Sequence, residues 1–138
     1  MINRTMYECV YNKIKAFLSA HNEFSPVVLK QPKGDKFPRV VVEMISNDVL
    51  SRDIGMHNVF SSVGIEINIY AKNMTSGKVK YADMQVAEKI ADDISFVCED
   101  LFEMKRTLYS PTPNIDTDVY RLTLRYSALQ DDKRNKFI

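Results

Sequence analysis

Few residue types that could perform catalysis occur in this chain of 138 residues, and they are scattered. His57 follows Asp53 by four residues, a spacing that on a helix would let the carboxylate orient an imidazole base. No serine or cysteine nucleophile lies nearby to complete such a site. His21 stands where a helix should end, and Cys9 and Cys98 stand among apolar residues that predict core packing. We therefore predict that the protein is not an enzyme, and an enzyme based on His57 is the third-ranked alternative.

Cofactor and metal sites leave spacing patterns that are missing from this sequence. A phosphate-binding loop needs clustered glycines, whereas the four glycines here are Gly34, Gly55, Gly64 and Gly77. Neither histidine has a partner at helical spacing, and the acidic residues do not follow a calcium-loop pattern. We expect no metal and no cofactor.

Composition places the chain among globular proteins of one domain, with 27% charged and 45% hydrophobic residues. The 19 basic and 18 acidic residues give a formal net charge of +1, which argues against a protein that coats nucleic acid or an acidic membrane. No run of about 18 apolar residues occurs, so we expect neither a membrane span nor a signal peptide. Two isolated cysteines favour a reducing compartment.

Hydrophobic periodicity predicts two helices, each with one apolar stripe. The first covers residues 2–20, where apolar residues recur at steps of three and four. The second covers 84–101, whose apolar residues fall within an arc of roughly 140° at 100° per residue. Residues 72–78 should form the turn that leads into this second helix.

Alternating and β-branched segments predict the strands. We expect them at 27–29, at 39–45, at 63–70, around Thr107 and Leu108, and at 119–127. Pro111 and Pro113 should interrupt the chain between the last two strands, which should pair in antiparallel fashion. Residues 46–58 have no regular period and are expected to form an irregular loop.

These elements predict an α+β fold, in the order α-β-β-β-α-β-β. The economical arrangement packs both helices on one face of a mostly antiparallel sheet of four to five strands, and leaves the other face polar. A single domain should cover residues 1–128. Residues 129–138 should form a C-terminal arm outside the core.

Interaction with other protein surfaces remains as the most plausible activity. The segments 46–60 and 129–138 hold apolar residues without a period that would bury them, so we expect them to reach neighbouring subunits. Arg121 and Arg125, on the polar face of the last strand, are candidates for ion pairs between subunits. The candidate interface residues are Asp48, Leu50, Arg52, Asp53, Met56, Phe60, Arg121, Arg125, Lys133, Arg134, Phe137 and Ile138.

The second half of the chain resembles a known family. Its most specific pattern is the turn Pro111-Thr112-Pro113-Asn114 followed by the strand Tyr120-Arg121-Leu122-Thr123-Leu124-Arg125-Tyr126. Residues 60–63, 67–73, 75–78 and 87–92 extend the similarity. Over about residues 58–128 the chain resembles the tail terminator, or tail completion, proteins of long-tailed bacteriophages.

The resemblance implies a structural virion protein that is assembled in the bacterial host cytoplasm. Such a protein forms a homo-oligomeric ring, usually a hexamer, on the head-proximal end of the tail tube. It ends tube elongation and takes part in joining the tail to the head. The implied partners are further copies of the chain, the tail tube protein and the head-tail connector protein, with DNA only passing through the lumen.

A small adaptor or RNA-binding α+β module is the alternative. It would use the polar face of the sheet, where such modules expose aromatic side chains for base stacking. The expected aromatic residue on that face is Tyr70, with Arg121 and Arg125 on another strand.

Overall fold

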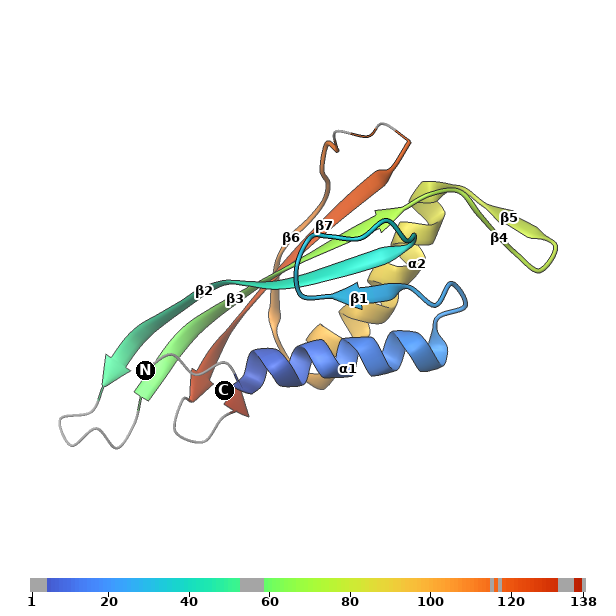
Figure 1. Ribbon diagram of the computed structural model, residues 1–138. Coiled ribbons are helices and arrows are strands. Elements are labelled where there is room, and N and C mark those ends of the chain that lie inside the picture. The colour runs from blue at the N-terminus through green and yellow to red at the C-terminus, as the bar shows by residue number, and fades with distance from the viewer. Residues whose placement is uncertain (1–4, 53–58, 115, 117, 132–135, 138) are drawn as a thin grey trace.

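In chain order, a first helix is followed by five strands, a second helical segment and three further strands (Figure 1). The computed structural model describes residues 5–52, 59–114, 116, 118–131 and 136–137. Its elements are α1 (Thr5–His21), β1 (Val27–Leu29), β2 (Arg39–Arg52), β3 (Val59–Ala71), β4 (Met74–Ser76), β5 (Val79–Tyr81), α2 (Asp83–Ser95), the π-helical turn η1 (Phe96–Leu101), β6 (Lys105–Pro111), β7 (Tyr120–Asp131) and β8 (Lys136–Phe137).

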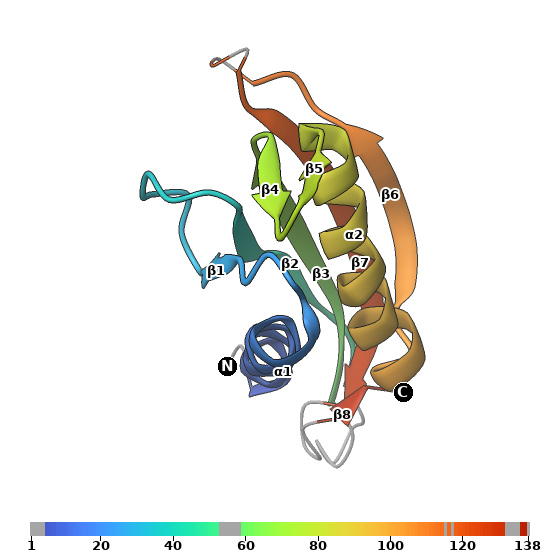
Figure 2. The same ribbon diagram turned by 90° about the vertical axis from the view of Figure 1, so that its right-hand side faces the viewer.

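The main sheet has the strand order β1-β2-β3-β7-β6, and β8 pairs with the end of β7. The β1–β2 pair is parallel and the other pairs are antiparallel. Both helices lie on one face of this sheet (Figure 2). The predicted α+β class with two helices on one face of a mostly antiparallel sheet is therefore confirmed. The separate β4–β5 hairpin and β8 are additions to the expected order.

The core lies between the helices and the sheet, and it follows the predicted periodicities. Alternate residues of the three long strands face the helices, because successive side chains of a strand point to opposite faces. The buried core residues include Val10, Ile14 and Leu18 of α1, Val86, Ile90 and Ile94 of α2, and Val40, Val42, Ile65, Ile67, Ile69, Leu122, Leu124 and Tyr126 of the sheet.

The prediction of an irregular loop at residues 46–58 is wrong for residues 46–52, because β2 continues to Arg52. Its pairing with β3 shifts register between Met44 and Ser46 and again between Val49 and Ser51. Each bulge adds a residue to one strand and so breaks the alternation of period two. The alternation of apolar and polar residues therefore stops at the first bulge, although strand β2 continues beyond it.

Two further boundaries differ from expectation. Residues 72–78 do not simply turn into the second helix, because they include β4 and the turn of the β4–β5 hairpin. Helix α2 ends at Ser95 and continues as η1. Met84 and Leu101, at the two ends of the predicted apolar stripe, are exposed.

The segment expected to form an arm begins inside the sheet. Strand β7 runs through Asp131, Gln130 is buried, and β8 pairs with β7 through Gln130 and Phe137. Within the described part of the chain, neither helix combines the length and the apolar character needed to span a bilayer.

Candidate functional site

The sheet face opposite the helices, called the open face below, carries three rows of residues paired across β2, β3 and β7. Register places Arg39 beside Tyr70 and Tyr70 beside Arg121 in one row. The next row is Val41, Asn68 and Thr123, and the third is Glu43, Glu66 and Arg125. Directly opposed side chains on one face lie within contact distance. The register alone therefore brings polar and charged residues from distant parts of the chain together.

Asn68 is the centre of a hydrogen-bond network on this face. Its side chain is buried, and its Oδ1 accepts a hydrogen bond from Arg121 Nε at 2.9 Å and another from Thr123 Oγ1 at 2.7 Å. Asn68 Nδ2 donates to Glu66 Oε1 at 3.1 Å. Glu66 also pairs with Arg125, with 3.4 Å between Oε2 and Nε. The network engages both arginines with partners on the open face of the same chain.

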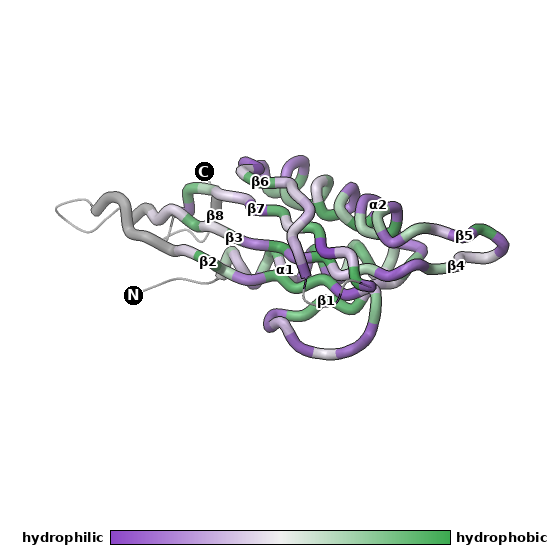
Figure 3. Tube along the Cα trace, turned by 90° about the horizontal axis from the view of Figure 1, so that it is seen from above, coloured by the Kyte–Doolittle hydropathy of each residue, from purple (hydrophilic) through white to green (hydrophobic). Residues whose placement is uncertain are grey.

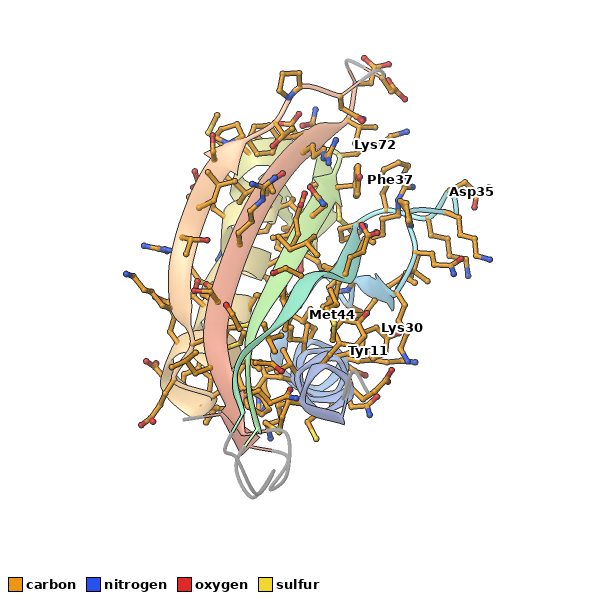
Figure 4. All side chains as sticks on the ribbon, turned by 90° about the vertical axis from the view of Figure 1, so that its left-hand side faces the viewer. Tyr11, Lys30, Asp35, Phe37, Met44 and Lys72 are labelled. Atoms are coloured by element: carbon orange, nitrogen blue, oxygen red, sulfur yellow. The ribbon has the colours of Figure 1, made fainter. Side chains whose placement is uncertain are left out.

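A stack of cations and aromatic rings occupies one end of the open face. The Cζ atom of Arg39 lies 4.6 Å from the ring centroid of Phe37 and 4.7 Å from that of Tyr70. Lys72 Nζ lies 4.5 Å from the Phe37 centroid, and Arg121 Cζ lies 5.6 Å from the Tyr70 centroid. Each ring therefore has two cations within cation–π range. Figure 4 shows Phe37 and Lys72 side by side at this end of the sheet.

The cations of this stack have no carboxylate partner among the described residues. Among the described residues, Arg39, Lys72 and Arg121 form no ion pair, and Arg39 Nε is buried without a hydrogen-bond partner. Tyr70 is only 9% exposed, so its ring is not available as a platform for a nucleic-acid base. The stack therefore supplies positive charge and not a stacking surface.

A groove of about 410 Å³ adjoins the stack under the loop that joins β1 to β2. Its floor includes the aliphatic side chains of Val27 and Leu29. Lys33, Lys36 and Arg39 also line it, with Asp35 as its one acidic residue. Figure 4 shows Asp35 at the outer end of the loop. An apolar floor with a cationic rim suits a ligand or a protein segment that is both acidic and partly apolar.

At the opposite end, the sheet runs past the helices. The apolar side chains of the helix-facing core extend toward this end as far as Met44, Val63 and Ala128, and the next helix-facing residues, Ser61 and Gln130, are also buried. Strand β2 continues to Arg52. This end projects beyond the start of α1 (Figures 1 and 3). Ile45 and Leu129, near the point where the helix layer ends, are 49% and 44% exposed.

Of the predicted interface residues, Arg121 and Arg125 both lie on the open face, where each has a partner within the same chain. Five others lie in the projecting strands or in β8, and only the course of their backbone is described: Asp48, Leu50, Arg52, Phe60 and Phe137. The remaining five lie outside the described residues: Asp53, Met56, Lys133, Arg134 and Ile138.

Of the residues considered for chemistry, Cys9 and His21 lie toward opposite ends of α1 and Cys98 lies in η1. His21 ends α1 with its ring centroid 4.5 Å from that of Phe17, and His57 lies outside the described residues. Cys98 is buried as predicted, and burial raises the pKa of its thiol to about 12. The prediction of core packing for Cys9 is wrong, because it is exposed on α1. Within the described ranges, no three His, Cys, Asp or Glu side chains are grouped to hold a metal.

Sequence reasoning missed Phe37, Arg39, Asn68 and Lys72 as members of a surface site. Arg39 and Tyr70 were assigned to strands, but the register that pairs them is not visible in either strand alone. The available signal was the alternation itself, because it assigns Arg39, Asn68, Tyr70 and Arg121 to the face that the helices do not cover. Phe37 and Lys72 lie just outside strands and had no such signal.

Comparison with known proteins adds no relative to this description. No protein-family model matches the chain, and no curated protein matches its sequence.

Proposed function

We propose that this protein is a tail terminator subunit of a long-tailed bacteriophage. In this proposal copies of the chain form a ring, most simply a hexamer, on the head-proximal end of the tail tube. The ring ends elongation of the tube and presents a surface to the head-tail connector. The protein acts through surfaces that meet other protein chains, and the virion tail is its place of action.

The observation that carries this proposal is the sheet end that projects past the helices. Strands β2, β3 and β7 continue there beyond the helix-packed core, and the exposed Ile45 and Leu129 lie near its boundary. Ser61 and Gln130, the helix-facing residues next to Val63 and Ala128, are buried, whereas Ile45 and Leu129 are exposed, so a neighbouring chain is the natural partner for these two apolar side chains. The other end of the open face carries the cationic stack. Two chemically different patches on one subunit are what a ring built by heterologous contacts requires.

Charge supports the same proposal. The net charge of +1 suits a lumen through which DNA passes, because a strongly basic lumen would bind phosphates and retard the DNA. The RNA-binding alternative receives less support, since the one aromatic residue that it placed on the open face, Tyr70, is buried between cations.

The test is the mass and shape of the assembled protein. Light scattering after size-exclusion chromatography should give about six times the 15.9 kDa subunit mass, and negative-stain images should show rings. Addition to the polymerising tube protein encoded in the same genome should shorten the tubes. A monomer of 15.9 kDa at every concentration, with tubes of unchanged length, would contradict the proposal.

A truncation tests the role of the C-terminal segment, which includes β8. Deletion of residues 130–138 would remove the buried Gln130 and shorten β7, so loss of assembly could reflect damage to the fold. Deletion of residues 132–138 keeps β7 whole and removes the short strand β8 that pairs with its end. We expect this shorter deletion to leave a folded subunit that assembles at higher concentration than the full chain. Unchanged assembly would remove the C-terminal segment from the interface.

A further inference from the structure

The groove under the β1–β2 loop has more basic than acidic residues in its lining. Lys33, Lys36 and Arg39 line it against the single carboxylate of Asp35. In the described part of the chain, none of these four side chains forms an ion pair. Lys33, Asp35 and Lys36 are exposed, so the loop presents them to whatever approaches.

A second loop of the same chain carries the opposite charge. Asp116 and Asp118, between β6 and β7, are both exposed, and within the described residues neither carboxylate is ion-paired. The backbone N–H of Asp118 donates to Asp116 Oδ1 at 2.9 Å, and that of Val119 donates to the Asp116 carbonyl at 3.2 Å. The exposed Pro113 adds apolar surface to this loop.

Val119 holds the acidic loop in place. It is 6% exposed and packs with Val41 and Tyr70 on the open face, beside Leu29 and Phe37. Beyond this packed residue, Asp116 and Asp118 of the loop are exposed. Figure 2 shows the β1–β2 and β6–β7 loops as two separate projections.

We propose that the basic groove of one subunit receives the acidic β6–β7 loop of a second copy. The cations of Lys33, Lys36 and Arg39 would meet Asp116 and Asp118, and the aliphatic floor would accept the apolar part of the loop. Groove and loop are different patches of one chain, so their contact is heterologous and can close into a ring. This inference rests on the proposed function and names one contact within the ring.

Charge complementarity selects this occupant. The loop brings two carboxylates to a groove whose net charge is opposite, and complementary potentials favour encounter and fix register. Nucleic acid fits less well, because Val27 and Leu29 offer phosphate groups an apolar floor and the ring of Tyr70 is buried.

Two complementary variants test the contact. The groove variant carries Lys33→Glu and Lys36→Glu. The loop variant carries Asp118→Lys together with Asp116→Asn, which keeps the oxygen that accepts the turn hydrogen bond. Lys13→Glu with Lys15→Glu, at exposed positions of α1, reproduces the charge change of the groove variant elsewhere. Circular dichroism and thermal unfolding check that all four proteins fold alike.

Sedimentation velocity over a range of concentrations then measures association. We expect each of the two variants to need at least about tenfold more protein than the wild type for half-association, because like charges now face each other. An equimolar mixture should recover to within about threefold of the wild type, since each groove then meets a loop of opposite charge. The α1 control should associate like the wild type. High salt should weaken the wild-type contact.

The outcomes separate this inference from the proposed function. Wild-type rings with unchanged assembly of the groove variant, or a mixture that does not recover, would overturn the contact and leave the ring proposal standing. A wild type that never associates would overturn both. Binding of a labelled 20-nucleotide DNA probe to the wild type and to the groove variant is measured as well. If the groove variant loses binding of this probe but still forms rings, nucleic acid is the occupant and the inference is wrong.

Discussion

Arg121 Nε donates a hydrogen bond of 2.9 Å to Asn68 Oδ1 across 53 residues of sequence. The same oxygen accepts the hydroxyl of Thr123 at 2.7 Å, and the Thr123 Oγ1 lies 2.5 Å from Thr112 Oγ1. One buried amide thus joins β3 to β7 and, through Thr123, to the residue that follows β6. The polar open face is therefore tied together by side chains as well as by the backbone ladder.

Replacement of this amide should destabilise the fold measurably. Asn68→Ala removes the acceptor for Arg121 and Thr123, and a buried polar group left without a partner costs about 1–3 kcal/mol. We expect a loss of that size in the free energy of unfolding, measured by urea denaturation. Thr107→Ala is the control, because Thr107 is exposed and its hydrogen bond to the Arg125 carbonyl is long, at 3.4 Å. Equal losses in the two variants would contradict the role assigned to Asn68.

Two tyrosines of α1 attach the helix to the sheet and allow a matched comparison. Tyr7 Oη donates to the Val42 carbonyl at 2.6 Å in a buried setting, one residue beyond the last β1–β2 pair. Tyr11 Oη donates to the Val28 carbonyl at 3.0 Å where water has access. Tyr7→Phe should cost about 1–2 kcal/mol in chemical denaturation, and Tyr11→Phe clearly less, because solvent can replace the lost bond. The reverse order would show that α1 is not anchored through Tyr7.

The fold was predictable where one period controls a whole element. The alternation of Val63, Ile65, Ile67 and Ile69 located the central strand, and the stripe of α1 located its buried face. The second half of β2 was not predictable, because two bulges reverse which residues face the helices. The short β4–β5 hairpin carries no core periodicity, since Lys78 to Lys80 are exposed.

The candidate site was predictable only in part, because strand pairing is not encoded in the pattern of a single strand. Arg121 and Arg125 stand out because they occupy the polar positions of an alternating strand. The partners that define the site, Asn68 and Arg39, belong to strands whose register depends on tertiary pairing. The charged groove requires both the β1–β2 loop and the parallel β1–β2 pair, and no local pattern encodes their contact.

The two cysteines should differ sharply in reactivity. Cys9 is exposed, whereas burial raises the pKa of the Cys98 thiol to about 12, so almost no thiolate exists at Cys98 at pH 8. Brief treatment of the native protein with iodoacetamide at pH 8 should therefore alkylate Cys9 alone, as read by peptide mass spectrometry. In urea both cysteines should react. Rapid labelling of Cys98 in the native state would contradict its place in the core.

Stability should fall in alkali because of Tyr126. Burial raises the pKa of its phenol well above 10, and the neighbouring Cys98 and Glu99 raise it further, although a hydrogen bond with Ser95 opposes the shift. The unfolded chain therefore releases this proton at lower pH than the native protein does. The neutral phenol makes its full contribution to the free energy of unfolding below about pH 10. As pH rises above that value, this contribution falls by about 1.4 kcal/mol per pH unit. Cys98 adds a similar loss that begins near pH 9 and ends at about 12.

Tyr126→Phe isolates the effect of this phenol. At pH 7 the variant should be less stable by about 1 kcal/mol, because it lacks the hydrogen bond that Tyr126 Oη donates to Glu99 Oε2 at 3.1 Å. Above pH 10 its free energy of unfolding should fall less steeply than that of the wild type, since one proton fewer is released on unfolding. Burial and the nearby Glu88 also raise the pKa of Tyr109, but its ring is 41% exposed and water partly solvates its phenolate, so Tyr109→Phe should keep the wild-type slope more closely. Identical slopes for wild type and Tyr126→Phe between pH 10 and pH 11 would show that Tyr126 ionises as readily in the native protein as in the unfolded chain.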